Sequence, residues 1–127
     1  MPGKILARIT GAGIAEDADI ILEKTSRDLK QEINLDINQL LKIPDDQLIN
    51  LFDVPEKRRR EYLETLADIL YQLAESLVPE EHNRVVMDSL YSRSLFLYEY
   101  LNTTGPVYSL ERQILIGKIR NLLGSSG

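Results

Sequence analysis

One run of four consecutive cationic side chains stands out in the sequence: Lys57, Arg58, Arg59 and Arg60. A cluster of this kind suits contact with phosphate, RNA or an acidic protein. The run also opens a predicted helix, where positive charge opposes the helix dipole, and this small cost favours a functional role. The competing interpretation is a solvated helix surface, on which these cations pair with glutamates one turn away: Glu56, Glu61 and Glu64.

The overall charge helps to weigh these two interpretations. The 127 residues include 15 Lys and Arg against 20 Asp and Glu, which gives a net charge of −5. A mildly acidic protein repels nucleic-acid phosphates, and the run has no basic or aromatic partners elsewhere in the sequence. We therefore interpret residues 57–60 as a solvated helix surface. Binding of nucleic acid or another anionic ligand through them is the alternative.

Acidic and histidine side chains show no recognisable metal-binding pattern. Glu80-Glu81-His82 are adjacent, and neighbours on a helix point about 100° apart, so they cannot surround one ion. Asp45-Asp46, and Asp17 with Asp19, lack the spacing of a calcium loop and suit helix starts instead. Carboxylates from different helices can still converge, so a carboxylate- and metal-dependent enzyme is a less favoured alternative.

Nucleophilic and cofactor chemistry also lacks a motif. The sequence has no cysteine, which excludes disulfides and thiolate nucleophiles. Ser92, Ser94 and Ser109 have no base near them in the pattern. Gly11 and Gly13 lack the preceding strand and the third glycine of a dinucleotide-binding loop. The sequence therefore predicts a protein that is not an enzyme, with no catalytic residue, no metal site and no cofactor.

Aromatic residues near position 96 suggest a different kind of function. Tyr91 and Tyr98 lie on the inward stripe of one predicted helix, whereas Phe96 and Tyr100 fall on another side of it. A helix that is apolar on more than one side is either central in its bundle or covered by another chain. Aromatic side chains are favoured interface anchors, so we predict that Phe96 and Tyr100 form a protein interface. A central position within the bundle is the alternative.

The elements that position these residues are helices, and the most strongly patterned one spans about residues 55–77. Pro55 suits a first helical turn, and Pro79 ends the segment because the residue before a proline avoids helical geometry. The apolar residues recur in steps of three and four, which places them on one stripe. They are Tyr62, Leu63, Leu66, Ala67, Leu70, Leu73, Ala74 and Leu77.

Two more helices are expected in the second half. Residues 80–101 share one apolar face: Val86, Leu90, Tyr91, Ser94, Leu97, Tyr98 and Leu101. The run from Asn102 to Pro106 predicts a loop. Ser109 is a typical N-cap for a last helix, which frays from Gly124. That helix is expected to turn four residues inward: Leu115, Ile119, Leu122 and Leu123.

The first half has a weaker pattern. We expect a short helical segment at residues 4–9, a helix at residues 14–33, and two short helices within residues 35–52, broken at Pro44. The longer helix has an expected buried stripe of Ile14, Ala18, Ile21, Leu22, Leu29 and Ile33. The short helices are expected to cover one end of the core with Leu40, Leu41, Leu48, Leu51 and Phe52.

These elements predict an all-α, single-domain helical bundle of five to six helices. Residues 14–124 form the expected domain, after a flexible or short helical lead-in at residues 1–13 and before a tail at residues 125–127. No apolar run approaches the roughly 20 residues of a membrane span, and the N-terminus lacks the apolar centre of a signal peptide. We therefore expect a cytoplasmic protein.

Residues 34–123 resemble a family of small, uncharacterised bacterial helical proteins. The resembling stretches are INLDINQLLKIPDDQLINLF, YLETLADILYQLAES, SRSLFLYEYL and YSLERQILIGKIRNLL. In that family the later helices resemble a tetratricopeptide helix pair. The matching positions here are Leu63, Leu66, Ala67 and Leu70 on the first helix and Ser94, Tyr98 and Leu101 on the second. The resemblance implies tetratricopeptide-like helix packing, and the family contributes no assigned activity.

These observations favour a non-enzymatic helical protein-interaction module that self-associates as a homodimer. The basic run and the acidic residues supply the two alternatives above, an anion binder and a metal-dependent enzyme.

Overall fold

The computed structural model describes residues 18–33, 35–77, 81–105 and 109–125. Within these ranges the chain forms six helices and no strand, which confirms the predicted all-α bundle of five to six helices. The helices are α2 (Ala18–Ile33), α3 (Ile37–Lys42), α4 (Asp45–Leu48), α5 (Glu56–Ser76), α6 (Glu81–Thr104) and α7 (Leu110–Ser125). None of the helices in the described part of the chain is both long and apolar enough to cross a membrane.

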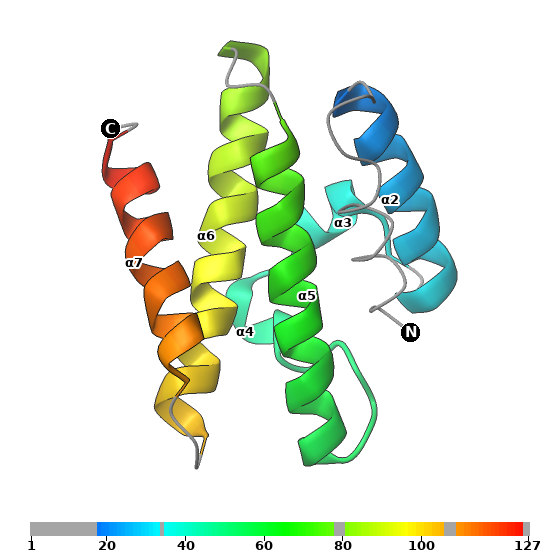
Figure 1. The fold of residues 1–127 in the computed structure, drawn as a ribbon. Helices are drawn as coiled ribbons and strands as arrows, with labels where there is room; N and C mark the ends of the chain where they lie inside the picture. The colour runs from blue at the N-terminus through cyan, green and yellow to red at the C-terminus, as the bar shows by residue number, and fades with distance from the viewer. Residues whose placement is uncertain (1–17, 34, 78–80, 106–108, 126–127) are drawn as a thin grey trace.

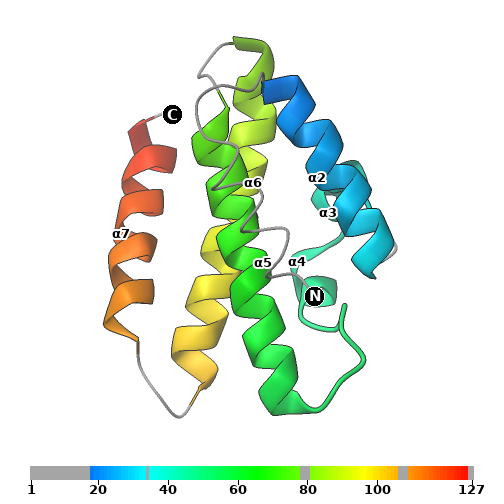
Figure 2. The same ribbon diagram turned by 45° about the vertical axis from the view of Figure 1, so that its right-hand side comes forward.

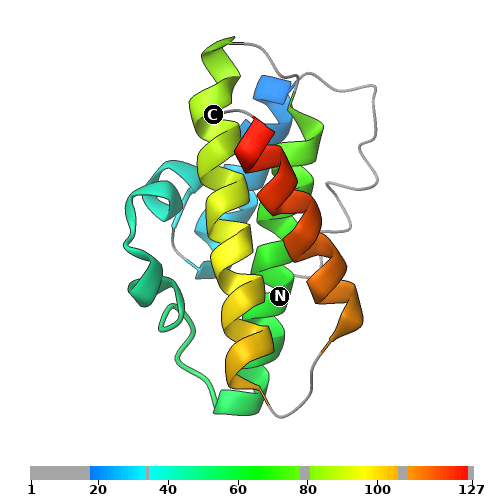
Figure 3. The same cartoon turned by 90° about the vertical axis from the view of Figure 1, so that its left-hand side faces the viewer.

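Three long helices run side by side in the order α5, α6, α7, each antiparallel to the one before it (Figure 1). Helix α2 lies on the opposite side of α5 from α7, with α3 beside it (Figure 2). Helices α3 and α4 flank the α5–α6 pair, and α7 lies across the other face of the bundle (Figure 3). Helix α6 is therefore central, because both α5 and α7 pack against it.

Helix α5 forms because its apolar residues repeat at the helical period, and its stripe is buried as the sequence predicts. The predicted residues Leu63, Leu66, Ala67, Leu70, Leu73, Ala74 and Leu77 are all buried, and Tyr62 is half-buried. Ile69, which lies outside the predicted stripe, is also fully buried. The buried face of α5 is wider than the predicted stripe because α5 contacts both α6 and α2.

Helix α6 continues to Thr104, so the loop predicted from Asn102 onward was placed too early. The hydroxyls of Thr103 and Thr104 donate to the carbonyls of Glu99 and Tyr100 in the preceding turn. Threonine has a low helix propensity, but a threonine hydroxyl can donate to a backbone carbonyl one turn earlier. These bonds give the two hydroxyls partners within the last turn of the helix. Gly105 lies just beyond the helix end, and Pro106 falls outside the described residues.

Helix α7 begins where the sequence predicts, and three of its four predicted inward residues lie in or against the core: Ile119 is buried, and Leu115 and Leu123 are partly buried. The Ser109 hydroxyl accepts a hydrogen bond from the Arg112 backbone N–H at 3.2 Å, which confirms the N-cap. Ile116 and Ile119 are buried, whereas Leu122, predicted to point inward, is 42% exposed. The predicted fraying from Gly124 is also wrong, because the helix runs to Ser125. Apolar residues occur on several sides of this helix, so periodicity alone did not fix its inward face.

The first half of the described chain has the predicted short helices. Helices α3 and α4 are separated at Pro44. Asp45 and Asp46 lie in the first turn of α4. Asp36 and Gln39 form a reciprocal capping box that starts α3. The five predicted residues of this segment lie in or against the core, with Leu40, Leu48 and Phe52 buried and Leu41 and Leu51 partly buried.

Several predictions for the N-terminal region lie outside the described residues. They are the segment at residues 4–9, the lead-in at residues 1–13, Gly11, Gly13, Ile14 and Asp17, together with the side chains of Ala18, Asp19, Ile21, Leu22 and Ile33. Leu29, the remaining member of that stripe, is buried in α2.

Candidate functional site

Small residues of α5 and α6 meet where these two helices pack against each other. Ala67 and Ser94 are both fully buried, and the Ser94 hydroxyl donates to the Ala67 carbonyl at 2.8 Å. A small side chain on each helix allows this approach, and the bond satisfies the buried hydroxyl. Polar groups nearby extend this contact into a network that joins three helices.

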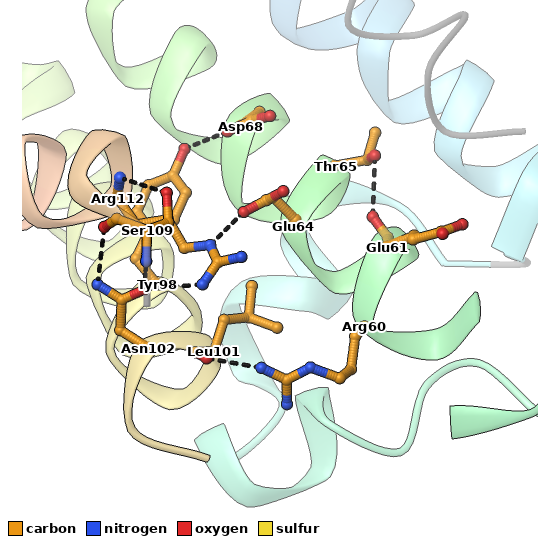
Figure 4. A network of polar contacts seen from close by, with 10 residues as sticks. All are labelled: Arg60, Glu61, Glu64, Thr65, Asp68, Tyr98, Leu101, Asn102, Ser109 and Arg112. Carbon is orange, nitrogen blue, oxygen red and sulfur yellow. Dashed lines mark hydrogen bonds and ion pairs between the residues drawn. The ribbon is translucent and has the colours of Figure 1, made fainter. Parts of the chain in front are cut away.

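Tyr98, which is buried, and Asp68, which is half-buried, form a second polar pair of the network. The Tyr98 hydroxyl donates to a carboxylate oxygen of Asp68 (Figure 4). Burial raises the pKa of Asp68, and the charge of Glu64 adds to the rise, while the Tyr98 bond and Arg112 act against it. Burial, reinforced by the bond to Asp68 and by its charge, raises the pKa of Tyr98.

Arg112 brings α7 into the same network. Its Nε donates to a Glu64 carboxylate oxygen, and its Nη1 donates to Asn102 Oδ1 at 2.7 Å. Asn102 also joins α6 to the start of α7, because its side chain accepts from the Ser109 N–H and donates to the Ser109 carbonyl, both at 3.3 Å. The Arg112 guanidinium therefore links α7 to Glu64 of α5 and Asn102 of α6 (Figure 4).

Arg60 performs a similar function at the carboxyl end of α6. Its guanidinium donates to the Leu101 carbonyl at 2.6 Å and to the Thr104 hydroxyl at 3.0 Å. A cation suits this position because helix carbonyls are unsatisfied there and the dipole is negative. The guanidinium carbon also lies 6.0 Å from the centre of the Tyr100 ring.

The structure therefore separates the four cations of the basic run. Arg60 is bonded to α6, Lys57 and Arg58 are exposed, and Arg59 is half-buried. Among these described residues, the ion pairs expected along α5 with Glu56, Glu61 and Glu64 are not formed. Glu64 pairs with Arg112 of α7 instead.

Arg93 is a positioning residue that the sequence reasoning missed. It donates to the carbonyls of Leu41 and Ile43 at the end of α3, and to the Asp45 carboxylate at 3.2 Å. These bonds hold the α3–α4 segment against α6. The available signal was an arginine with apolar residues one helical turn away on either side, at Leu90, Phe96 and Leu97.

The polar groups of this network bond to one another across helices. Among the described residues, each buried side-chain nitrogen or oxygen has a hydrogen-bond partner. In the same part of the chain no three His, Asp or Glu side chains converge as metal ligands would. Glu80 and the side chain of His82 lie outside the described residues, and Glu81 is exposed. The polar groups at this junction fix the relative positions of α5, α6 and α7.

The two predicted interface aromatics lie on the central helix. Phe96 and Tyr100 are half-buried, and both pack against the core. The position of α6 between α5 and α7 accounts for apolar residues on more than one of its sides, which was the alternative left open by the sequence. The exposed parts of both rings remain accessible to another molecule.

A more exposed apolar surface lies on α7, on the side away from α6. Leu110 is 68% exposed and Ile114 is 54% exposed. Gly117 follows on the same side, and a Cβ atom added to it would meet no atom within 4 Å. We call Leu110, Ile114 and Gly117 the outer stripe of α7. The sequence does not reveal this stripe, because α7 has apolar residues on several sides.

Comparisons with protein-family models, curated proteins and solved structures find no match for this chain. The resemblance to uncharacterised bacterial helical proteins, and the tetratricopeptide-like packing that it implies, therefore stay predictions.

Proposed function

We propose that this chain is a non-enzymatic, cytoplasmic helical module that binds protein, with a second copy of itself as the partner. The exposed apolar stripe on an outermost helix carries this proposal. Water contact with large aliphatic side chains is unfavourable, and burying one such side chain gains about 1.5–3 kcal/mol. Leu110 and Ile114 lie one helical turn apart, so a single partner surface can cover both.

The internal polar network supports a structural rather than a catalytic use of the ionisable groups. Asp68, Glu64 and Arg112 are bonded to other residues of the chain that hold helices together. A catalytic acid or base instead needs to be within hydrogen-bond reach of a substrate. Packing and capping account for these side chains without a reaction.

The proposal is tested by measuring the molar mass of the full chain by sedimentation equilibrium, from low to high micromolar concentration. We expect a reversible monomer–dimer equilibrium, because a contact made by one or two helices lies at the small end of stable interfaces. A chain that stays monomeric throughout this range would overturn the proposed self-association.

Phe96 and Tyr100 provide a second variant for this measurement. If they belong to the interface, replacing both by glutamate raises the dimer dissociation constant of a variant that is still folded. The effect is doubled because each change occurs twice across a two-fold axis. Circular dichroism and denaturant unfolding of the same variant report its fold. A folded double variant with wild-type dimer affinity would place the interface elsewhere.

A further inference from the structure

Nothing in the described part of the chain explains a glycine at position 117. It lies in the interior of α7, where glycine is about 1 kcal/mol less favourable than alanine. Its missing side chain does not relieve any crowding, because an added Cβ would point into open space. Glycine on an outward helix surface leaves a shallow hole into which a side chain of another helix fits.

The outer stripe places this hole beside a side chain of suitable size. Leu110, Ile114 and Gly117 are four and three residues apart, so they lie along one line of the helix surface. Ile114 is a large apolar side chain and Gly117 is the adjacent gap. Two copies of this stripe in opposite directions fit each Ile114 into the gap at the other Gly117.

Charges beside the stripe show the same self-complementarity. Glu111 and Lys118 are seven residues apart, which is close to two helical turns, so both lie on one flank of the stripe. Both are exposed, and neither forms an ion pair with another described residue. One acid and one base at this spacing match their own reversed copy.

We propose that α7 packs antiparallel against α7 of a second copy, across a two-fold axis that passes between Ile114 and Gly117. This inference rests on the proposed self-association and assigns it a surface. In this arrangement Glu111 of each copy lies beside Lys118 of the other. Their heights along the axis differ by two residues, about 3 Å, which both side chains can span.

The same charges disfavour a parallel arrangement. A two-fold axis parallel to the helices brings opposite flanks together, so Lys118 of one copy faces the flank with Arg120 of the other. Antiparallel helices related by a perpendicular two-fold axis bring identical flanks together, and each flank then carries opposite charges at matching heights. Like charges at an interface weaken the complex, so the antiparallel arrangement is favoured.

The balance of charge also distinguishes a second copy from other partners. A nucleic-acid surface requires a predominance of cations, whereas this flank has one acid and one base. An acidic or basic peptide would match only one of the two residues. A second copy satisfies both with the residues already present.

Charge exchange tests this assignment on the full chain. Glu111→Lys and Lys118→Glu, made singly, each place like charges across the axis twice, and we expect the dimer dissociation constant to rise about tenfold. The double variant Glu111→Lys with Lys118→Glu restores opposite charges, so its dissociation constant should return to near the wild-type value. A different protein partner would not be restored by this exchange.

A matched control is available on α5. Lys57 and Glu61 are also exposed, four residues apart, and without ion pairs among the described residues. Exchanging them makes the same change in charge away from α7, and we expect no effect on dimerisation. Gly117→Gln provides a second probe, because glutamine favours helix but fills the gap opposite Ile114. It should weaken the dimer while the helical content is retained.

The outcomes distinguish the proposed self-association from its assignment to α7. Rescue by the double exchange, with weak dimerisation of Gly117→Gln, supports the antiparallel α7 interface. A wild-type dimer that is insensitive to all these variants overturns the α7 assignment but leaves self-association standing. A wild type that is monomeric at high micromolar concentration overturns both.

Discussion

The two sides of α7 use their residues in contrasting ways. On the inner side, Arg112, Ile116 and Ile119 join α6 or the polar network, and each has a partner inside the chain. On the outer side, Leu110 and Ile114 expose aliphatic surface, and Gly117 leaves space that none of the described residues fills. The inner side therefore accounts for the fold of the monomer, while the outer side is the part of α7 that the monomer does not explain.

The largest expected effect contrasts a core leucine with an outer-stripe isoleucine. Leu70→Ala removes a fully buried side chain of α5 and should lower the free energy of unfolding by about 2–5 kcal/mol. Ile114→Ala, made on an exposed side chain, should change it by less than about 0.5 kcal/mol at low protein concentration. Denaturant titration measures both. Equal losses for the two variants would contradict the assignment of inner and outer surfaces.

The next effect contrasts two arginines of α7. Arg112→Gln breaks hydrogen bonds to Glu64 and Asn102 and should destabilise the chain by about 1.5–3 kcal/mol, as for bonds to charged groups. Arg120→Gln removes a more exposed ion pair with Glu99, and we expect a loss below about 1 kcal/mol. A double-mutant cycle with Glu64→Gln isolates the Arg112 pair. A coupling near zero would show that the network does not hold α7 in place.

Alkaline pH tests the buried Tyr98 hydroxyl. Its folded pKa is raised above the unfolded value of 10.0, so its contribution to stability is present below pH 10.0 and is lost as pH rises further. In that range the unfolded tyrosine ionises and the folded one does not, which lowers the free energy of unfolding by up to about 1.4 kcal/mol per pH unit. The stability difference between wild type and Tyr98→Phe, measured from pH 8 to pH 11, should shrink. A constant difference would indicate that Tyr98 ionises equally in both states.

The smallest effects distinguish two glycines. Gly117→Ala should raise the free energy of unfolding by about 0.5–1 kcal/mol, because the helix gains a better residue and the added methyl group meets nothing. Gly105→Ala should lower it, because the added Cβ would clash with Arg60 Nη2 and would lie 2.9 Å from the Leu101 carbonyl oxygen. Thermal unfolding at low concentration compares the two variants. A loss of stability on Gly117→Ala would reveal a packing constraint inside the chain.

The sequence by itself determined the helical class and the main core stripe. Leucines at helical spacing from Leu63 to Leu77 can be buried together on only one face, and Pro44 and Ser109 determine local boundaries through backbone chemistry. These features depend on residues close together in the chain, so they can be predicted from the sequence. The end of α6 was misplaced because Asn102 and the following threonines normally favour loops, while contacts with Ser109 and Arg60 keep this turn helical.

Tertiary structure alone decided which long-range partners meet and which face of α7 turns inward. Arg60 reaches Leu101 across 41 positions, and Arg112 reaches Glu64 across 48, so no local pattern could pair them. Helix α7 has apolar residues on several sides, and periodicity could not choose between Leu122 and Ile116 as the buried one. The packing of α7 against α6 made that choice, because it turned Ile116 and Ile119 toward the core and left the outer stripe exposed.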